Sequence, residues 1–512
     1  MKANTIHPVI DLFAGPGGLG EGFASLHHPM LPSHYAFKTV ISIEKDVSSH
    51  QTLKLRHFYR NFQLNTVPDD YYHYLENRIT LEELYKRHPV ESAHADHTAW
   101  LCTLGEAPHE DVKKRIIEAL NYQKKWVLVG GPPCQAYSLV GRSRMKGQEN
   151  FENDPRHFLY REYLRILIDH KPPIFVMENV KGLISSKIQG RYVINDILRD
   201  LSNPSSIIDS KSSGLEYKLY SLSQPGIMNL TGDPSNFVVK AEEYGIPQAR
   251  HRIFILGIRS DIDIVPKILE KVNLRRTVSD AIGDLPKIRS GISKGLDSNS
   301  IWLETLTEMT QQSWFKHGKE NGLASLAEYI EMVLESIEVQ LFEKDSTTYS
   351  QPDHFLDWFH DKRLKILLSH EARSHMKSDL QRYFFSSTFA QVYDISPKLS
   401  DFPKELLPAH KNITEGISGK KFADRFRVQL SDTPSTTVTS HISKDGHYYI
   451  HYDPIQCRSL TVREAARLQT FPDNYKFEGN RTSQYHQVGN AVPPLLANKI
   501  ASIVFDILER ME

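Results

Sequence analysis

Short apolar runs alternate with helical stretches from His7 to about Arg259, and this alternation constrains the fold more than any other feature of the chain. The runs are continuously apolar and rich in β-branched residues, as expected of strands in a sheet that helices cover on both faces. They are Val9–Phe13, Thr39–Ile43, Trp126–Val129, Ile174–Met177 and Ile253–Ile258. The pattern predicts an α/β fold with a doubly wound, mostly parallel sheet.

The spacing of apolar residues along the sequence changes after residue 272. Apolar residues then recur at helical spacing from Leu323 to Ile337, which predicts an amphipathic helix. The stretch 353–391 is aromatic-rich and largely helical in pattern, and further helical segments are expected at 461–471 and 494–508.

A chain of 512 residues is too long for one ordinary core, so we expect more than one domain. The first domain covers residues 1–272, and a second, smaller domain covers 273–455. The C-terminal segment, 456–512, is expected to return to the first domain.

No run of the chain approaches the roughly 18 apolar residues that a membrane span requires. The N-terminus has no basic leader or small-residue cleavage site. The three cysteines, Cys102, Cys134 and Cys457, form no CxxC pair, which argues against a disulfide framework. His94 and His97 near Cys102 lack a fourth ligand at zinc spacing, so no metal site is expected. We expect a cytoplasmic protein without membrane contact.

Acidic and basic residues balance at 62 each, so the net charge gives no support to nucleic-acid binding. Phosphate binding needs only a local basic stripe, however. Two such stripes are candidates, and ordinary solvated charge explains each of them equally well. They consist of Arg142, Arg144 and Lys146, and of Arg458, Arg463 and Arg467.

The first apolar run ends in a glycine-rich turn, Asp11–Phe23, that opens a helix. Glycines in such a turn allow positive φ angles and let a ligand approach a helix N-terminus closely. A mere tight turn would have the same composition. Glu44, which follows the next apolar run, is suited to accept hydrogen bonds from ribose hydroxyls. Together the two elements indicate a nucleoside-bearing cofactor.

Three further blocks carry chemically useful residues. In Gly130–Ser138, Cys134 follows a strand within a stiff Gly-Pro frame, so it is either a nucleophile or a packing residue. In Phe175–Val180, Glu178 is either a cap or a proton donor. In Gln248–Arg252, period-two spacing is expected to place both arginines on one strand face.

With Gln487–Pro494 near the C-terminus, these blocks resemble the C5-cytosine DNA methyltransferases in order and spacing, over residues 7–260 and 430–500. The resemblance implies a Rossmann-like methyltransferase core, S-adenosyl-L-methionine as the cofactor and double-stranded DNA as the substrate. It implies cofactor contacts from Phe13, Ala14, Gly15, Gly17, Gly18, Glu44, Pro132 and Asn490. The catalytic residues that it implies are Cys134, Glu178, Arg250 and Arg252.

By the same resemblance, residues 273–455 form a target-recognition domain, which the block 458–472 supports. Base readers are expected among the polar run 433–447 and around His370, Arg373, His375, Lys377 and Arg382, where ordinary surface polarity is an equal explanation. The family's acidic contact to the cofactor adenine has no clean counterpart here, and Asp96 and Glu106 stay open as candidates. The resemblance also suggests a monomer on DNA, in a prokaryotic cytoplasm, with a cognate restriction endonuclease.

Three other functions would share part of this pattern. A transfer-RNA methyltransferase of the same family would need no middle region as large as this one. A catalytically inactive DNA-binding homologue would not need Cys134, Glu178 and the glycine-rich turn together. A dinucleotide-dependent oxidoreductase would explain the turn but not the cysteine loop.

Overall fold

The computed structural model describes residues 6–132, 155–188, 191–205, 214–228, 232–318, 323–349, 357–409, 413–419 and 423–512. The chain divides into two compact units. Unit 1 comprises Met1–Leu274, Phe477–Gly479 and Ala491–Glu512, and unit 2 comprises Arg275–Lys476 and Asn480–Asn490. The C-terminal segment, which we expected to return to the first domain as a whole, is therefore shared between the two units.

Unit 1 is built on an eight-stranded sheet, as far as the described residues show, with the order β10-β13-β7-β6-β1-β4-β5 and β11 paired with β13. Neighbours from β5 to β7 pair in parallel, whereas β13 runs antiparallel to both β7 and β10. The expected mostly parallel α/β sheet is confirmed. The strands are β1 (His7–Leu12), β4 (Phe37–Glu44), β5 (Ala99–Leu101), β6 (Val127–Gly130), β7 (Ile174–Val180), β10 (Tyr217–Tyr220), β11 (Val238–Lys240) and β13 (His251–Arg259).

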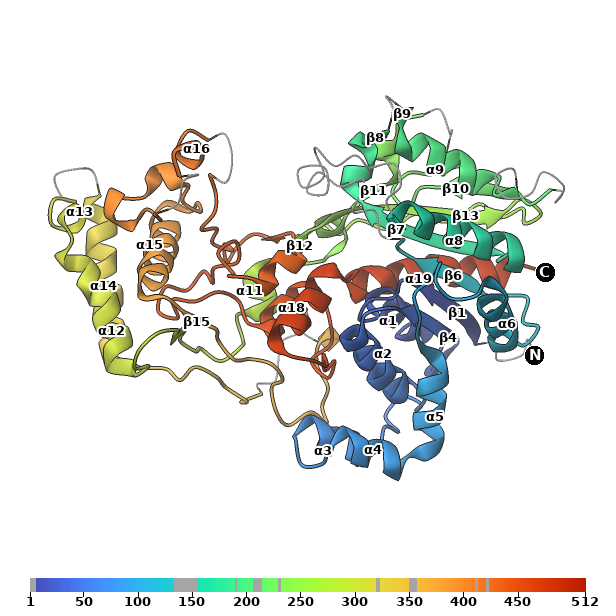
Figure 1. Cartoon of the computed structure of the whole chain (residues 1–512), viewed down its shortest axis with the longest axis horizontal. Coiled ribbons are helices and arrows are strands. Elements are labelled where there is room, and N and C mark those ends of the chain that lie inside the picture. Colours follow the sequence, from blue (N-terminus) through green and yellow to red (C-terminus); the bar gives the residue numbers. More distant parts are fainter. Residues whose placement is uncertain are drawn as a thin grey trace. The chain divides into compact units, whose positions relative to one another are not determined.

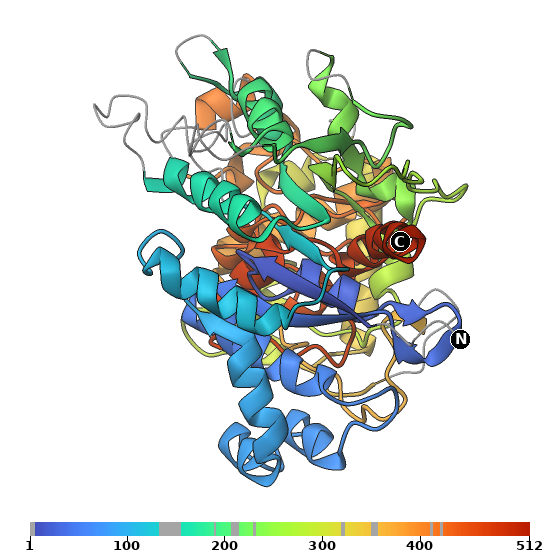
Figure 2. The same cartoon turned by 90° about the vertical axis from the view of Figure 1, so that its right-hand side faces the viewer.

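Helices cover both faces of this sheet (Figures 1 and 2). Because successive strand side chains point to opposite faces, Val9 packs in one apolar cluster and Ile10 in the other. The first cluster lies under α1 (Gly18–Ala24) and α19 (Pro494–Arg510). The second lies under α6 (His109–Leu120), α8 (Pro155–His170) and α9 (Val193–Ser202).

Glycines bring the C-terminal helix against the first one. A Cβ atom on Gly22 of α1 would lie 2.3 Å from the Cβ of Ala497 on α19, and one on Gly18 would lie 2.2 Å from the carbonyl oxygen of Val492. Only residues without a side chain permit this approach. The helical stretch Arg481–Arg510 is long and apolar enough to cross a membrane by length and composition, yet 67% of its most apolar window is buried in the protein, as in the core helix of a soluble protein.

Further helices lie beside the β4–β5 edge of the sheet. The helix α2 (Val47–Arg60) follows β4 and packs against α5 (Pro89–Thr98), which leads into β5. Between them the chain forms α3 (Asp69–Leu75) and α4 (Leu81–Arg87). A short antiparallel pair, β2 (His27–His28) and β3 (Leu31–Tyr35), precedes β4.

The regular elements of unit 2 are mainly helices, joined by long irregular segments. Its apolar cluster joins α12, α14 and α15, and the predicted amphipathic helix is confirmed because Leu326, Ile330 and Val333 of α14 are buried there. The expectation of a largely helical stretch at 353–391 is wrong for most of 359–376, where the chain is irregular. The helices are α11 (Val278–Ile282), α12 (Asn299–Thr307), α13 (Ser313–Lys316), α14 (Ala324–Val339), α15 (Lys377–Tyr393), α16 (Ile413–Ile417), α17 (Val462–Leu468) and α18 (Arg481–Asn490).

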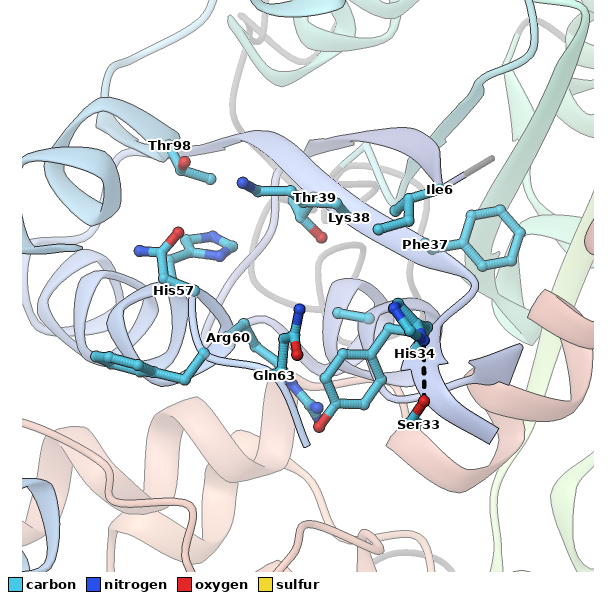
Figure 3. A pocket seen from close by; sticks show the side chains of 14 residues that line it. Ile6, Ser33, His34, Phe37, Lys38, Thr39, His57, Arg60, Gln63 and Thr98 are labelled. Atoms are coloured by element: carbon cyan, nitrogen blue, oxygen red, sulfur yellow. Dashed lines mark hydrogen bonds between the residues drawn. The ribbon is translucent and has the colours of Figure 1, made fainter. Parts of the chain in front are cut away.

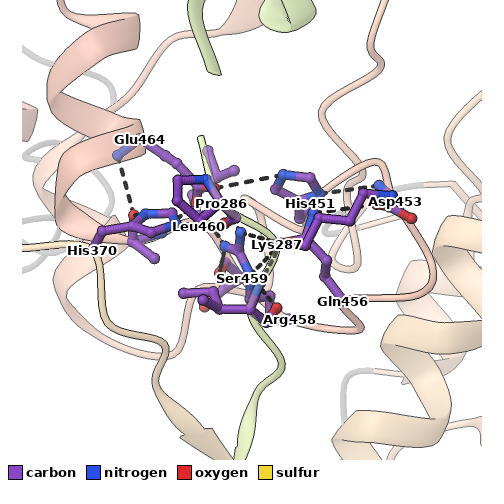
Figure 4. A network of polar contacts seen from close by, with 12 residues as sticks. Pro286, Lys287, His370, His451, Asp453, Gln456, Arg458, Ser459, Leu460 and Glu464 are labelled. Carbon is purple, nitrogen blue, oxygen red and sulfur yellow. Dashed lines mark hydrogen bonds and ion pairs between the residues drawn. The ribbon is translucent and has the colours of Figure 1, made fainter. Parts of the chain in front are cut away.

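A buried network of charges surrounds the start of α17 (Figure 4). Arg458 donates two hydrogen bonds to Glu464, of 2.7 and 2.6 Å, and both side chains are 1% exposed. Thr461 caps α17 by accepting from the Glu464 N–H, while its own N–H donates to the Glu464 carboxylate at 2.7 Å. Burial alone would raise the pKa of Glu464, but Arg458 lowers it far below its usual range.

The three arginines of this region are structural. Arg458, Arg463 and Arg467 are each at most 1% exposed. Arg467 pairs with Asp473 at 2.9 Å, and Arg463 donates to the carbonyl oxygen of Leu368 at 2.9 Å. The hypothesis of a phosphate-binding stripe at these arginines is wrong, because their charges are compensated inside unit 2.

We predict that Glu464→Ala destabilises unit 2 by about 3 to 5 kcal/mol, because it leaves the buried Arg458 charge without a partner. Urea unfolding followed by tryptophan fluorescence measures the change. Glu118→Ala is the control, because Glu118 is 57% exposed and lies 3.9 Å from Lys114, so it should change stability by less than about 0.5 kcal/mol. Equal effects of the two substitutions would contradict a structural role for the network.

Candidate active site

The carboxyl ends of four parallel strands meet at one edge of the sheet in unit 1. Leu12 of β1 lies opposite both Ile43 of β4 and Gly130 of β6, and Gly130 lies opposite Met177 of β7. The segments at these strand ends carry most of the predicted site residues. Ligands of open α/β sheets bind at such an edge.

The glycine-rich turn after β1 has an unusual backbone. Phe13, Gly15 and Gly17 all have positive φ angles, of 56°, 57° and 94°. Such a value is uncommon for a residue with a side chain, and strained residues of this kind cluster at functional sites. The turn is fixed to the sheet because Ala14 donates its N–H to the carbonyl oxygen of Ile43 at 3.0 Å.

Glu44, the last residue of β4, is held rigidly at the mouth of this turn. Its Oε2 atom accepts the Gly15 N–H at 2.8 Å. Its Oε1 atom accepts the N–H groups of Lys45 at 2.9 Å and Asp46 at 2.7 Å. The carboxylate therefore has a fixed orientation beside the glycine-rich backbone.

Asp11 lies beneath the same turn and was not recognised as a site residue from the sequence. It is 1% exposed, and a Cβ atom on Gly20 of α1 would lie 2.6 Å from its Oδ2 atom. Burial raises its pKa to about 8, and nearby Glu44 adds to this, whereas the Gly20 N–H opposes it. The sequence does contain a sign of this buried acid, because Asp11 interrupts an otherwise apolar strand.

Glu178 and Arg252 form an ion pair between neighbouring strands. The Arg252 Nε atom lies 3.1 Å from the Glu178 Oε1 atom, and the two side chains are 15% and 14% exposed. Burial raises the pKa of Glu178, although Arg252 and Arg250 oppose the rise. A carboxyl group with a raised pKa is suited to general acid catalysis near neutral pH.

The chain is similar in sequence to known methyltransferases. The model of the family described as C-5 cytosine-specific DNA methylase matches residues 97–506. The type II methyltransferase M.Bpa9945I of Bacillus paralicheniformis is 33% identical, over 98% of this chain and 99% of its own. The type II methyltransferase M.DdeI of Desulfomicrobium norvegicum is 25% identical, over 96% of this chain and 87% of its own.

The chain belongs to the C-5 cytosine-specific DNA methylase family. Its activity is that of a DNA (cytosine-5-)-methyltransferase. The fold also resembles that of a crystal structure from E. coli, described as a DNA modification methyltransferase encoded within a prophage. The TM-score is 0.50 and the sequence identity is 18%, with 98% of this chain and 100% of the other chain covered.

In this methyltransferase, Asn179 connects β7 to the start of the cysteine loop. Its side-chain N–H group donates to the carbonyl oxygen of Pro132 at 3.2 Å, and the residue is 3% exposed. A Cβ atom on Gly131 would lie 2.8 Å from the Glu178 Oε2 atom, so the loop leaves β6 directly against this acid. Cys134 lies outside the described residues, as do Arg142, Arg144 and Lys146.

Arg250 has a different place in the strand pattern from the one that the sequence suggested. Arg250 is 2% exposed and lies between β12 (Gln248–Ala249) and β13, so the period-two argument does not apply to it and Arg252. Asn490 is the exposed last residue of α18 in unit 2, where its amide contacts His486 at 3.1 Å.

Several suggested base readers of unit 2 are structural instead. His370, Arg373 and His375 are 3%, 9% and 6% exposed. His370 contacts the carbonyl oxygen of Pro286 at 2.8 Å, and the Arg373 guanidinium stacks 3.7 Å from the ring centre of Tyr485. These buried side chains cannot reach a base edge, whereas Lys377 in the same region is exposed.

We predict that Asp11→Asn makes the stability of unit 1 less dependent on pH. The folded-state pKa of about 8 exceeds the unfolded value, so the protein loses stability as pH rises from about 4 to 8. Over this range, the free energy of unfolding of the variant should rise relative to that of the natural protein by on the order of 1 kcal/mol per pH unit. Urea unfolding at pH 5 to 8 measures the difference, with Asp263→Asn as the exposed control. Parallel pH curves for the natural protein and Asp11→Asn would contradict the assignment.

Proposed function

We propose that this methyltransferase moves a methyl group from S-adenosylmethionine to cytosine C5 within a specific DNA sequence, through a covalent bond between Cys134 and cytosine C6. One observation carries the proposal. Glu178, an acid with a raised pKa paired with Arg252, lies against the first residues of the loop that bears Cys134.

The chemistry needs these groups because C5 of cytosine is a weak nucleophile within an aromatic ring. The Cys134 thiolate adds to C6 while Glu178 supplies a proton to N3, which makes C5 an enamine carbon. C5 then takes the methyl group. Loss of the C5 proton and departure of the thiolate restore the ring. The stacked base hides C6, so the cytosine must first leave the duplex.

Arg252 keeps Glu178 oriented. Its Nε atom lies 3.1 Å from the Glu178 carboxylate, and burial still raises the pKa of the acid. The protonated form of Glu178 is therefore more favoured than in a solvent-exposed glutamate. Arg250 lies close enough to oppose this rise, so we assign it a positioning role at the base.

The residues at the β1–β4 edge fit the cofactor. A Cβ atom on Gly15 would meet nothing within 4 Å, so the turn faces open space there. The Glu44 carboxylate is fixed beside this space by backbone N–H groups and can accept the ribose hydroxyls. Phe13, which follows β1, and Pro132, two residues after β6, are further cofactor contacts that we assign at this edge. The bound cofactor supplies a methyl group on a sulfonium.

Of the two acids considered for the adenine, we favour Glu106. Cys102 follows β5 and donates its N–H to the carbonyl oxygen of Glu44 at 2.9 Å, so the segment after β5 borders the ribose site. Glu106 is exposed in that segment. Asp96 precedes β5 and pairs with Lys54 at 2.6 Å.

We assign sequence recognition to unit 2 and infer which of its faces avoids DNA. On α14 the exposed acids Glu328, Glu331, Glu335 and Glu338 lack an interspersed basic residue. Phosphates would be repelled from this face, so the readers lie on other segments. We propose that the enzyme acts as a monomer in a prokaryotic cytoplasm. The similarity to type II methyltransferases of bacteria supports a cognate restriction endonuclease.

We predict that DNA carrying 5-fluorocytosine traps this enzyme, because fluorine cannot leave C5 as a cation. The adduct should require S-adenosylmethionine, survive denaturing electrophoresis, and disappear in Cys134→Ser. Glu178→Gln should slow trapping by roughly 100-fold or more without loss of cofactor binding, because an amide cannot protonate N3. Normal methylation by Cys134→Ser would overturn the mechanism, and faster trapping on fluorinated RNA would favour the transfer-RNA alternative.

We also predict that Glu44→Gln weakens cofactor binding by roughly tenfold or more, because charge-assisted hydrogen bonds to the ribose are lost. Calorimetric titration with S-adenosylmethionine measures this. Glu110→Gln, on the exposed first turn of α6, is the matched control and should bind normally. Unchanged affinity in Glu44→Gln would remove this residue from the cofactor site.

A further inference from the structure

A cavity lies in unit 1, away from the proposed cofactor edge (Figure 3). Its volume is about 160 Å³, and it is formed by β3, the first residues of β4 and the end of α2. Thr39 lines it, whereas Glu44 ends the same strand. At about 3.3 Å per residue, these two positions on β4 are separated by roughly 17 Å. The cavity is therefore distinct from the proposed cofactor site.

The cavity is electropositive. Lys38 and Arg60 line it, and none of its lining residues is an Asp or Glu. The buried Glu21 carboxylate behind the wall pairs with both Arg56 and Arg60, so these three groups together keep one positive charge, to which Lys38 adds a second. Burial lowers the pKa of His57 to about 4, so this histidine contributes a neutral ring, which contacts the Ser42 hydroxyl at 2.9 Å. A cavity with cations and no acid on its wall favours an anion.

A buried hydroxyl on the wall lacks a partner. Thr39 is 6% exposed, and its Oγ1 atom makes no hydrogen bond within the described part of the chain. Figure 3 shows its oxygen turned toward the middle of the lining side chains. Burying an unpaired hydroxyl is costly, which indicates a ligand atom or water at this point.

The remaining wall is aromatic and apolar. The Arg60 guanidinium lies 4.9 Å from the ring centre of Tyr35 and is held by Glu21 of α1. Phe37 and Phe62 also line the cavity. Its volume resembles that of a cavity of about 150 Å³ that accepts benzene, so it has room for more than a bare oxyanion.

We propose that this cavity binds an organic phosphate monoester. The phosphate lies at Lys38 and Arg60, the Thr39 hydroxyl donates to one of its oxygens, and a small planar group rests on Tyr35. A free metabolite or a DNA 5′-terminus could supply this chemistry.

The test is calorimetric titration of the full chain with phenyl phosphate, followed by Lys38→Met and Thr39→Val. Saturable binding is expected, weakened about tenfold or more in each variant. Lys114→Met is the matched control on an exposed lysine and should bind normally. Thr39→Val should also keep or raise the melting temperature without ligand, because it removes an unpaired buried hydroxyl.

Inorganic phosphate should bind more weakly than phenyl phosphate, because it has no ring that could contact the aromatic wall. Competition by a 5′-phosphorylated oligonucleotide, but not by its 5′-hydroxyl form, would identify a DNA end as the source. Competition by neither would identify a free metabolite. Absence of saturable phenyl phosphate binding at millimolar concentration, or undiminished affinity in both variants, would overturn the proposal.

Discussion

The parallel pairing of β1 with β4 on one side and β6 on the other is the constraint on which the site depends. Because these strands run the same way, the glycine-rich turn, Glu44 and Pro132 all emerge at one edge. Hydrogen bonds from Ala14 to Ile43 and from Gly15 to Glu44 then fix the turn to its neighbour. A one-residue slip of β1 would invert its two apolar faces, so the core and the site share one register.

The chain closes this domain with its own C-terminus. The helices α1 and α19 cover the same face of the sheet. Because Gly22 has no side chain, Ala497 of α19 can pack directly against the backbone of α1. Residues separated by most of the sequence thereby complete one core. Glycines therefore serve two purposes around α1. Gly22 allows close helix packing, and Gly15 and Gly17 allow the backbone turn that precedes the helix.

Strand ends were predictable from the sequence, whereas the environments of charged residues were not. Glu44 and Glu178 follow apolar runs, so their place at the sheet edge followed from periodicity alone. Arg458, Arg463 and Arg467 gave no sign of burial, because their partners, such as Asp473 and the Leu368 carbonyl, are set by tertiary contacts. Asp11 was hidden within an apolar strand for the same reason. The structure of the Cys134 loop lies outside the described residues, so its assignment rests on sequence and family.

Two Glu–Arg pairs show how the number of hydrogen-bond donors around an acid changes its pKa. Glu464 receives two bonds from Arg458 and one from the Thr461 backbone, and its pKa falls although burial opposes this. Glu178 has a single contact with Arg252, and burial raises its pKa. Each added donor stabilises the charged form. An acid that must release a proton therefore requires burial with few donors, and an arginine close enough to orient it without fully compensating its charge.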